Sequence, residues 1–359
     1  MSKNLSGYVC VVTGATRGLG KAIAIALGET GATVYITGRT LDPPGQALGK
    51  DSECLRETAR LIESLGGKAI PVAVDHSDDN QVAGLFTRIR REQSGRLDVL
   101  VNNAFSAADY LLSEAGPESV YWEPSNAVRS PSEEWDLVNR VGLRNAYTCC
   151  VLATRIMVEC RSRVDTNNHH HSAVGLMKKR GSVATGLPTG IIINISSIGG
   201  TKRIFNVAFC AGKSALDRMT LEMAADLRKR DIDVAVVSLL PGLVRTEQVV
   251  AALESGTAPA FLTRAISVGI DVPPEIPGKV VAALVGQPRQ ALAKQSGRCL
   301  VGAELAYQFG LRVSGRTYPK NPRAFKTILQ LAGWTRMAVF VPAFVKIPYW
   351  VLAIVTSKF

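Results

Sequence analysis

A glycine-rich turn near the start of the chain restricts its fold more than any other feature of the sequence. The turn, Thr13-Gly14-Ala15-Thr16-Arg17-Gly18-Leu19-Gly20, joins an apolar β-branched run to a helical pattern with Ile23 and Leu27 on one face. Glycines in a strand–turn–helix unit let the main chain approach a pyrophosphate, which the amides at the helix start can bind. Glycine also serves ordinary tight turns, but this context favours a dinucleotide site. The residues expected to bind the dinucleotide are Gly14, Thr16, Arg17, Gly18, Leu19 and Gly20.

Short β-branched runs alternate with helical patterns along the chain, which is typical of βαβ units and a parallel sheet. We therefore expect an α/β fold with one Rossmann-like, doubly wound sheet of about seven strands. The predicted strands span residues 8–13, 33–37, 69–74, 98–101, 190–195, 233–239 and 299–301. The predicted helices span residues 17–29, 52–65, 80–93, 132–159 and 208–229.

These elements predict a single domain over residues 1–305 and a basic, apolar extension over residues 306–359. Two polar stretches, at about 41–50 and 161–188, are expected to be inserted surface loops. The second contains three adjacent histidines, His169 to His171, without a carboxylate or cysteine cluster. Three neighbouring loop residues cannot easily face one ion, so no metal site is predicted.

Charge and cysteine content limit the partners and the compartment. The net charge is +12 and is concentrated in two basic clusters, at residues 161–180 and 312–358. Neither cluster is set among base-stacking aromatics within a recognisable module, so nucleic acid is not an expected partner. The seven cysteines are odd in number and lack CxxC spacing, which suits a reducing compartment. The first apolar run, Tyr8 to Val12, is too short for a signal peptide and leads directly into the glycine turn, so no N-terminal targeting segment is expected. We expect a cytoplasmic protein that is not secreted.

The end of the second predicted strand distinguishes between the two nicotinamide dinucleotides. An acidic residue there would bind the ribose 2′-hydroxyl of NAD and repel the 2′-phosphate of NADP. This chain has Thr37-Gly38-Arg39-Thr40 instead, and Arg17 lies in the glycine turn. Two guanidinium groups could pair with that phosphate, which favours NADP(H) over NAD(H). The alternative is that Arg39 is a solvated loop residue.

Further motifs, taken in order, resemble those of the short-chain dehydrogenase/reductase family over residues 7–301. Besides the glycine turn they are Asp75, Asn102-Asn103-Ala104, Asn194-Ile195-Ser196-Ser197, Lys213 and Pro241-Gly242. The resemblance implies transfer of hydride between NADP(H) and a small-molecule carbonyl or alcohol, such as a steroid-like or xenobiotic ketone or aldehyde. It also implies a homodimer, and its strongest likeness within the family implies the cytoplasmic face of the endoplasmic reticulum.

The resemblance assigns roles only to residues that match. It implies that cofactor contacts are made by Asp75 and His76 at the adenine, Asn103 and Ala104 along the cofactor, and Pro241, Gly242, Val244 and Thr246 near the nicotinamide. Ser197 resembles the serine that hydrogen-bonds the substrate carbonyl, with Ser196 as the alternative that spacing leaves open. Lys213 resembles the lysine that binds the nicotinamide ribose. Outside this family context, either serine could simply end a strand and Lys213 could be a surface charge.

Two positions depart from the family pattern. The Tyr-x-x-x-Lys pair reads Phe209-Cys210-Ala211-Gly212-Lys213, so the expected catalytic proton donor has no hydroxyl. Gly142 stands where many members place an asparagine that holds a proton-relay water. Two functions therefore remain open: an oxidoreductase, or an NADP(H)-binding pseudoenzyme or scaffold.

The C-terminal segment, residues 324–359, combines aromatic side chains with scattered cations. Arg336, Lys346, Pro342 and Pro348 divide it into uncharged runs of about ten residues, whereas a membrane span needs about twenty. Trp334, Phe340, Phe344, Tyr349 and Trp350 favour a segment lying on an anionic membrane surface. The alternative is a tail packed on its own domain or on a partner subunit.

Overall fold

The computed structural model describes residues 4–42, 53–113, 120–123, 129–168, 186–315, 317–342, 344–348 and 351. Seven parallel strands form the main sheet, in the order β3-β2-β1-β4-β5-β6-β9. They are β1 (Val9–Thr13), β2 (Thr33–Gly38), β3 (Lys68–Ala73), β4 (Val99–Asn102), β5 (Gly190–Ile195), β6 (Val234–Leu240) and β9 (Cys299–Val301). The predicted doubly wound α/β fold is confirmed, with every strand end within one residue of its expected place.

Alternate residues of each central strand face two separate cores, which explains why these strands are apolar throughout. In β1, Cys10 and Val12 join the core on one face of the sheet, whereas Val9 and Val11 join the core on the other. Burial on both faces is the normal state of a parallel strand flanked by helices.

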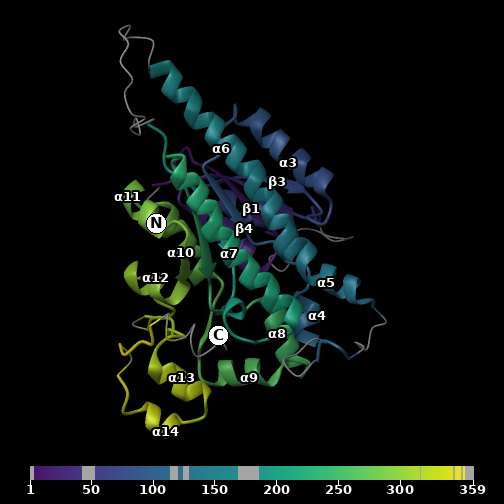
Figure 1. The fold of residues 1–359 in the computed structure, drawn as a ribbon, viewed down its shortest axis with the longest axis vertical. Helices are drawn as coiled ribbons and strands as arrows, with labels where there is room; N and C mark the ends of the chain where they lie inside the picture. Colours follow the sequence, from purple (N-terminus) through teal and green to yellow (C-terminus); the bar gives the residue numbers. More distant parts are fainter. Residues whose placement is uncertain are drawn as a thin grey trace.

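Helices cover both faces of the sheet (Figure 1). The first face is covered by α1 (Gly18–Glu29), α2 (Leu55–Ser64), α10 (Glu275–Val285), α11 (Arg289–Gln295) and α12 (Gly302–Gln308). The second is covered by α3 (Asp79–Glu92), α6 (Ala146–Asn168) and α7 (Val207–Lys229).

The helix expected over residues 132–159 is in fact longer and interrupted. It comprises α5 (Pro131–Asn139), a π-helical turn η1 (Arg140–Asn145) and α6. Ser130 starts it with a capping box, in which its side chain accepts the amide of Glu133 and the Glu133 carboxylate accepts the amide of Ser130.

Helix α6 extends into the stretch that was expected to be the second inserted loop. Helix α6 continues through Arg161 to Asn168, so the prediction of a loop from about residue 161 is wrong at its start. The guanidinium of Arg161 is buried and donates to the main-chain oxygens of Met157 and Pro188, which fixes this end of the helix. Residues 169–185, with the three histidines, and residues 43–52 of the first insert lie outside the described residues.

Several short elements were not expected from the sequence. Strands β7 (Leu243–Val244) and β8 (Asp271–Val272) form a small parallel pair. Helices α10, α11 and α12 were not predicted either, and the remaining unexpected elements are α4 (Ala108–Ser113), η2 (Ile198–Gly200), α8 (Glu247–Glu254), α9 (Ala260–Ser267), α13 (Phe325–Leu331) and α14 (Thr335–Ala338). The last two lie at one end of the molecule, away from the main sheet (Figure 1). Within the described ranges, no helix combines the length and the apolar character that crossing a membrane requires.

Candidate functional site

A pocket of about 940 Å³ opens at the carboxyl ends of the central strands. Its lining includes residues that follow β1, β2, β4 and β5, together with the first turn of α1. β1 lies between β2 and β4, where the strand order reverses direction. Open α/β sheets bind their ligands at this topological switch point.

The glycine turn leaves the start of α1 open to the pocket. Arg17, which precedes the helix, makes no side-chain capping bond to the first-turn amides, and Gly18, Leu19 and Gly20 all line the pocket. Gly18 has a φ of 56°, and a Cβ on Gly20 would lie 2.0 Å from the oxygen of Gly14. This turn therefore requires glycine, and its amides suit an anion such as a pyrophosphate.

Asn103 and Thr13 hold the turn against the end of β4. The Asn103 side-chain amide donates to the oxygens of Thr13 and Gly14, both at 2.9 Å. The Thr13 hydroxyl oxygen accepts the main-chain amides of Asn103 and Ala104, at 2.9 and 3.0 Å. These bonds fix the turn before any ligand binds.

Two cations and two carboxylates lie where the second strand reaches the pocket. Arg39 follows β2 and is exposed. Arg17 pairs with Glu53, with 2.5 Å between Nη1 and Oε2. Asp75 accepts the main-chain amide and the hydroxyl of Ser77, and these bonds, with the charge of Arg39 adding to them, hold the pKa of Asp75 below its usual value. The pocket thus contains a cation at the strand position that distinguishes NADP from NAD.

His76 is a buried, neutral member of the pocket wall. Its Nδ1 donates to Oδ1 of Asn145 at 3.0 Å, so its Nε2 accepts the hydroxyl of Thr37 at 2.7 Å. Burial lowers the pKa of His76. A neutral histidine whose two ring nitrogens are both hydrogen-bonded is held in place and is not available to transfer a proton.

Lys213 and Ser197 both line the pocket. The Lys213 ammonium donates to the oxygen of Ile195 at 2.9 Å, and burial lowers the pKa of Lys213 to about 8 although Asp217 acts against this shift. The Ser197 oxygen accepts the amide of Gly199 at 3.1 Å, which leaves its hydroxyl hydrogen available to a ligand. Ser196, the alternative from spacing, also lines the pocket but is 3% exposed.

Phe209 forms an aromatic wall beside Lys213. It is 6% exposed, and its ring packs edge-on against Phe105 and Phe205, with centroids 5.9 and 5.1 Å away. The ammonium of Lys213 lies 5.3 Å from the Phe105 ring centroid. The rings around Phe209 are apolar. Where the family pattern places a tyrosine hydroxyl, this chain therefore has only a packed hydrocarbon ring.

Most of the residues predicted from sequence come together in this one pocket. It is lined by Gly14, Thr16, Arg17, Gly18, Leu19, Gly20, Arg39, Asp75, His76, Asn103, Ala104, Ser197, Phe209, Lys213 and Thr246. Pro241, Gly242 and Val244 are not among the lining residues, and Val244 is buried in β7. Thr246 caps α8, and its methyl group would lie 3.2 Å from a Cβ on Gly18, so it stands beside the glycine turn.

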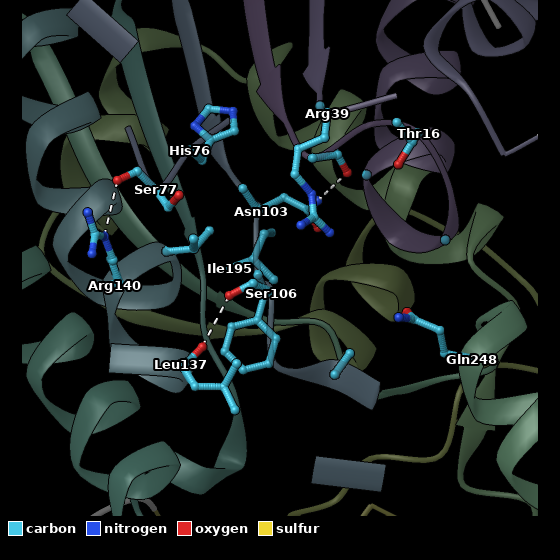
Figure 2. A pocket seen from close by; sticks show the side chains of 18 of the residues that line it. Thr16, Arg39, His76, Ser77, Asn103, Ser106, Leu137, Arg140, Ile195 and Gln248 are labelled. Carbon is cyan, nitrogen blue, oxygen red and sulfur yellow. Dashed lines mark hydrogen bonds between the residues drawn. The ribbon is translucent and has the colours of Figure 1, made fainter. Parts of the chain in front are cut away.

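The sequence analysis missed one side of the pocket. Figure 2 shows Arg140 donating to the oxygen of Ser77, and the Ser106 hydroxyl donating to the oxygen of Leu137, both at 3.1 Å. The residues that α5 and η1 contribute recur at helical spacing: Ser132, Glu133, Asp136, Leu137, Arg140 and Val141. That spacing was the signal available for finding them. Among the described residues, no group of three His, Cys, Asp or Glu side chains could hold a metal ion.

Comparisons with known proteins agree with this geometry. The short chain dehydrogenase family matches residues 8–163 and 172–255. Dehydrogenase/reductase SDR family member 1 of Mus musculus is 36% identical over 359 residues, covering 99% of both chains. The protein of the same name from Homo sapiens is 35% identical over 363 residues, covering 100% of both.

A solved structure is similar as well. The crystal structure of a metagenomic short-chain oxidoreductase in complex with NADP has a TM-score of 0.54 and 26% identity, and covers 83% of this chain and 97% of that one. The family match extends over more than half of the sequence, and the full-length similarity to the mouse and human proteins is independent of it. On these grounds the chain belongs to the short-chain dehydrogenase/reductase family.

Proposed function

We propose that the protein is an NADP(H)-dependent oxidoreductase that reduces a ketone or aldehyde, of steroid-like or xenobiotic type, or oxidises the matching alcohol. The observation that carries the proposal is the meeting of an uncapped helix start, Lys213 and Ser197 in one pocket of about 940 Å³. A pocket of this size suits a dinucleotide headgroup and a small organic substrate together.

The choice of NADP(H) rests on Arg39. It follows the strand end where NAD-binding members carry a carboxylate, and it lines the pocket. A guanidinium there supplies charge-assisted hydrogen bonds to a 2′-phosphate. The metagenomic relative, whose structure was solved with NADP, supports the same choice.

The side chains of the pocket have separate tasks in this proposal. Bound NADPH supplies the hydride for the carbonyl carbon. The Ser197 hydroxyl donates a hydrogen bond to the carbonyl oxygen, and the Lys213 ammonium donates to the nicotinamide ribose. Phe209 and Phe105 exclude water from this region but offer no proton. Loss of a general acid typically lowers the rate by roughly 100-fold to 10,000-fold, so turnover through water or Ser197 is expected to be slow.

The second candidate function is an NADP(H)-binding pseudoenzyme or scaffold, and Phe209 is the observation that favours it. The ring is buried between Phe105 and Phe205, an arrangement that stabilises the pocket wall without any chemical group. A protein of this kind would bind the cofactor as tightly as an enzyme and would catalyse no useful hydride transfer.

One comparison separates these functions. NADPH binding, followed by nucleotide fluorescence, and NADPH-dependent reduction of a panel of ketones and aldehydes are measured for the native protein and for Phe209→Tyr. The control is Phe205→Tyr, which adds the same hydroxyl to a neighbouring ring that does not line the pocket.

Measurable native turnover, raised by Phe209→Tyr and unchanged by Phe205→Tyr, is the expected result. Activity that appears only in Phe209→Tyr would refute the enzyme and support the pseudoenzyme. Failure of NADPH to bind either form would refute both.

From the family likeness alone we further propose a homodimer at the cytoplasmic face of the endoplasmic reticulum. Sedimentation equilibrium and cell fractionation test these two points directly.

A further inference from the structure

The end of the molecule formed by α13, α14 and residues 339–342 and 344–348, here called the C-terminal tip, gathers exposed apolar side chains. Of the 16 large hydrophobic side chains that are exposed among the described residues, seven lie between Phe325 and Val345. The most exposed of these seven side chains are Phe340 at 87%, Phe344 at 80% and Val339 at 72%. Clusters of this kind on a folded surface mark an interaction site.

The C-terminal tip is a folded unit rather than a frayed end. Ala324 and Lys346 form an antiparallel bridge, and the amides of Phe325 and Ile347 donate to the oxygens of Val345 and Arg323, both at 2.9 Å. Ala338 and Leu329 are buried beneath it. The exposed aromatic rings are therefore presented by a fixed backbone.

The base of the tip is attached to the domain through Glu304 of α12. Its Oε1 atom accepts the Nη1 donor of Arg323 and the side-chain amide of Asn321, both at 2.9 Å, and Lys346 lies 3.8 Å away. On the other side, the Arg264 guanidinium of α9 lies against Gly333. The tip is thus held in a defined orientation relative to the domain.

The charge of this region has one sign. From residue 305 to residue 359 the sequence holds eight Lys and Arg residues and no Asp or Glu. Arg336 is exposed within α14, between the exposed side chains of Trp334 and Met337. A two-fold contact between two copies would place this cationic surface against itself, which like-charge repulsion disfavours. A partner with an apolar interior and an anionic surface would complement the C-terminal tip.

We propose that the C-terminal tip is a docking surface for an anionic lipid bilayer, with Phe340, Phe344 and Trp334 inserted at the level of the headgroups and acyl chains and with Arg336 on the lipid phosphates and carboxylates. Aromatic rings bury apolar area at the interface, and each nearby cation adds attraction to anionic lipid. The aromatic rings give affinity and the cations give preference for negative charge. Docking of this kind requires no membrane-spanning helix.

The test is co-sedimentation of the full-length protein with vesicles of phosphatidylcholine alone or of phosphatidylcholine mixed with phosphatidylserine. We expect binding to the mixed vesicles that weakens as salt is added and is much weaker to phosphatidylcholine alone. Phe340→Ser/Phe344→Ser is expected to lower the partition coefficient by roughly 10-fold to 100-fold, and Arg336→Glu by roughly 10-fold.

The matched control is Tyr121→Ser/Trp122→Ser, which removes an aromatic pair exposed at 76% and 68% elsewhere on the surface. An equal loss in this control, equal binding to both kinds of vesicle, or no binding to either would overturn the proposal. A tip variant that converts a dimer to a monomer and leaves vesicle binding unchanged would assign the surface to a second copy instead. Vesicle binding requires no turnover, so its outcome is independent of the proposed oxidoreductase activity.

Discussion

The side-chain nitrogen of Lys213 lies 5.9 Å from the ring centroid of Phe209, on the same helix and one turn away. The neighbour that the family pattern provides for this lysine is a phenol, whereas here it is a hydrocarbon ring. The apolar surroundings lower the pKa of Lys213 to about 8, so its charge is lost within a pH range that can be studied.

The affinity for NADPH is expected to fall as pH rises through about 8. In the proposed function the Lys213 ammonium donates to the nicotinamide ribose below that pH, whereas above it the neutral amine would be a weaker donor. A loss of roughly tenfold in affinity is therefore expected. Titrations of nucleotide fluorescence across this range measure the effect. Lys213→Met should bind more weakly at neutral pH and show a flat profile; a variant that kept the native slope would contradict the prediction.

The same shift predicts how stability depends on pH. The folded-state pKa of Lys213 is lowered from 10.5 to about 8, so between these values the unfolded chain keeps a proton that the folded protein has released. The free energy of unfolding therefore gains a term that rises with pH across this interval, of the order of 1–2 kcal/mol after allowance for solvent.

Urea unfolding of the native protein and of Lys213→Met at a series of pH values isolates this term, because other groups cancel in the difference. The difference between the two proteins should change in favour of the native protein as pH increases from about 8 to about 10.5. Two parallel stability profiles would show that burial does not disfavour the charge.

Arg39 is expected to set the preference for NADP(H). Arg39→Ala should weaken NADPH binding by roughly 10-fold to 100-fold and leave NADH binding unchanged, because only NADPH carries the 2′-phosphate. Arg56→Ala removes a cation from α2 that does not line the pocket, and should affect neither cofactor. Calorimetry of the native protein and both variants with each nucleotide gives the six dissociation constants. An equal loss of affinity for NADH and NADPH in Arg39→Ala would assign Arg39 a structural role.

Glu53 is expected to oppose NADPH through its pair with Arg17. Glu53→Gln breaks the ion pair with Arg17, whose other carboxylate partner, Asp109, is farther away at 3.7 Å, and it removes a negative charge from the pocket lining. NADPH should therefore bind severalfold more tightly, by roughly 0.5–1 kcal/mol. The double variant Glu53→Gln/Arg17→Ala should lose this gain. A gain that survived without Arg17 would attribute the effect to the carboxylate alone.

Gly212 provides the space that Asn139 occupies between α5 and α7. A Cβ there would lie 1.9 Å from Oδ1 of Asn139, whose side-chain amide donates to the oxygen of Ala208 at 3.1 Å. Gly212→Ala should therefore destabilise the protein by about 1–3 kcal/mol despite the better helix propensity of alanine.

Gly84→Ala is the control, because Gly84 lies within α3 with nothing within 4 Å of the added Cβ. That change should stabilise by about 0.5–1 kcal/mol. Adding Asn139→Ala to Gly212→Ala should recover part of the loss, and strictly additive effects in the double variant would refute the clash.

The strands and the glycine turn could be predicted because local pattern alone determines them. Each central strand is an apolar run bounded by polar residues, and the glycine at position 18 adopts the positive φ that a turn of this kind requires. The π-helical interruption at η1 was missed because the hydrophobic pattern runs on through it from α5 into α6.

Relationships between distant segments could not be predicted. Arg161 looked like the start of a polar loop, yet its guanidinium spans from α6 to the oxygen of Pro188 and is buried. The pairing of Arg17 with Glu53 likewise joins residues 36 apart in the chain. Composition indicates whether a residue type is usually buried or exposed. Whether a particular charge is compensated depends on the residues that the fold brings next to it.

Gly142, in the π-helical turn η1, affects how a proton could be supplied to the pocket. A Cβ at this position would lie 2.9 Å from the ring of Phe105, so the ring fills space beside the helix where many family members hold a relay water on an asparagine. A side chain at position 142 able to hold such a water would collide with this ring. If the protein reduces carbonyls as proposed, we expect the proton to come from elsewhere in the pocket, and a bulky substrate that excludes solvent from the pocket to be reduced more slowly.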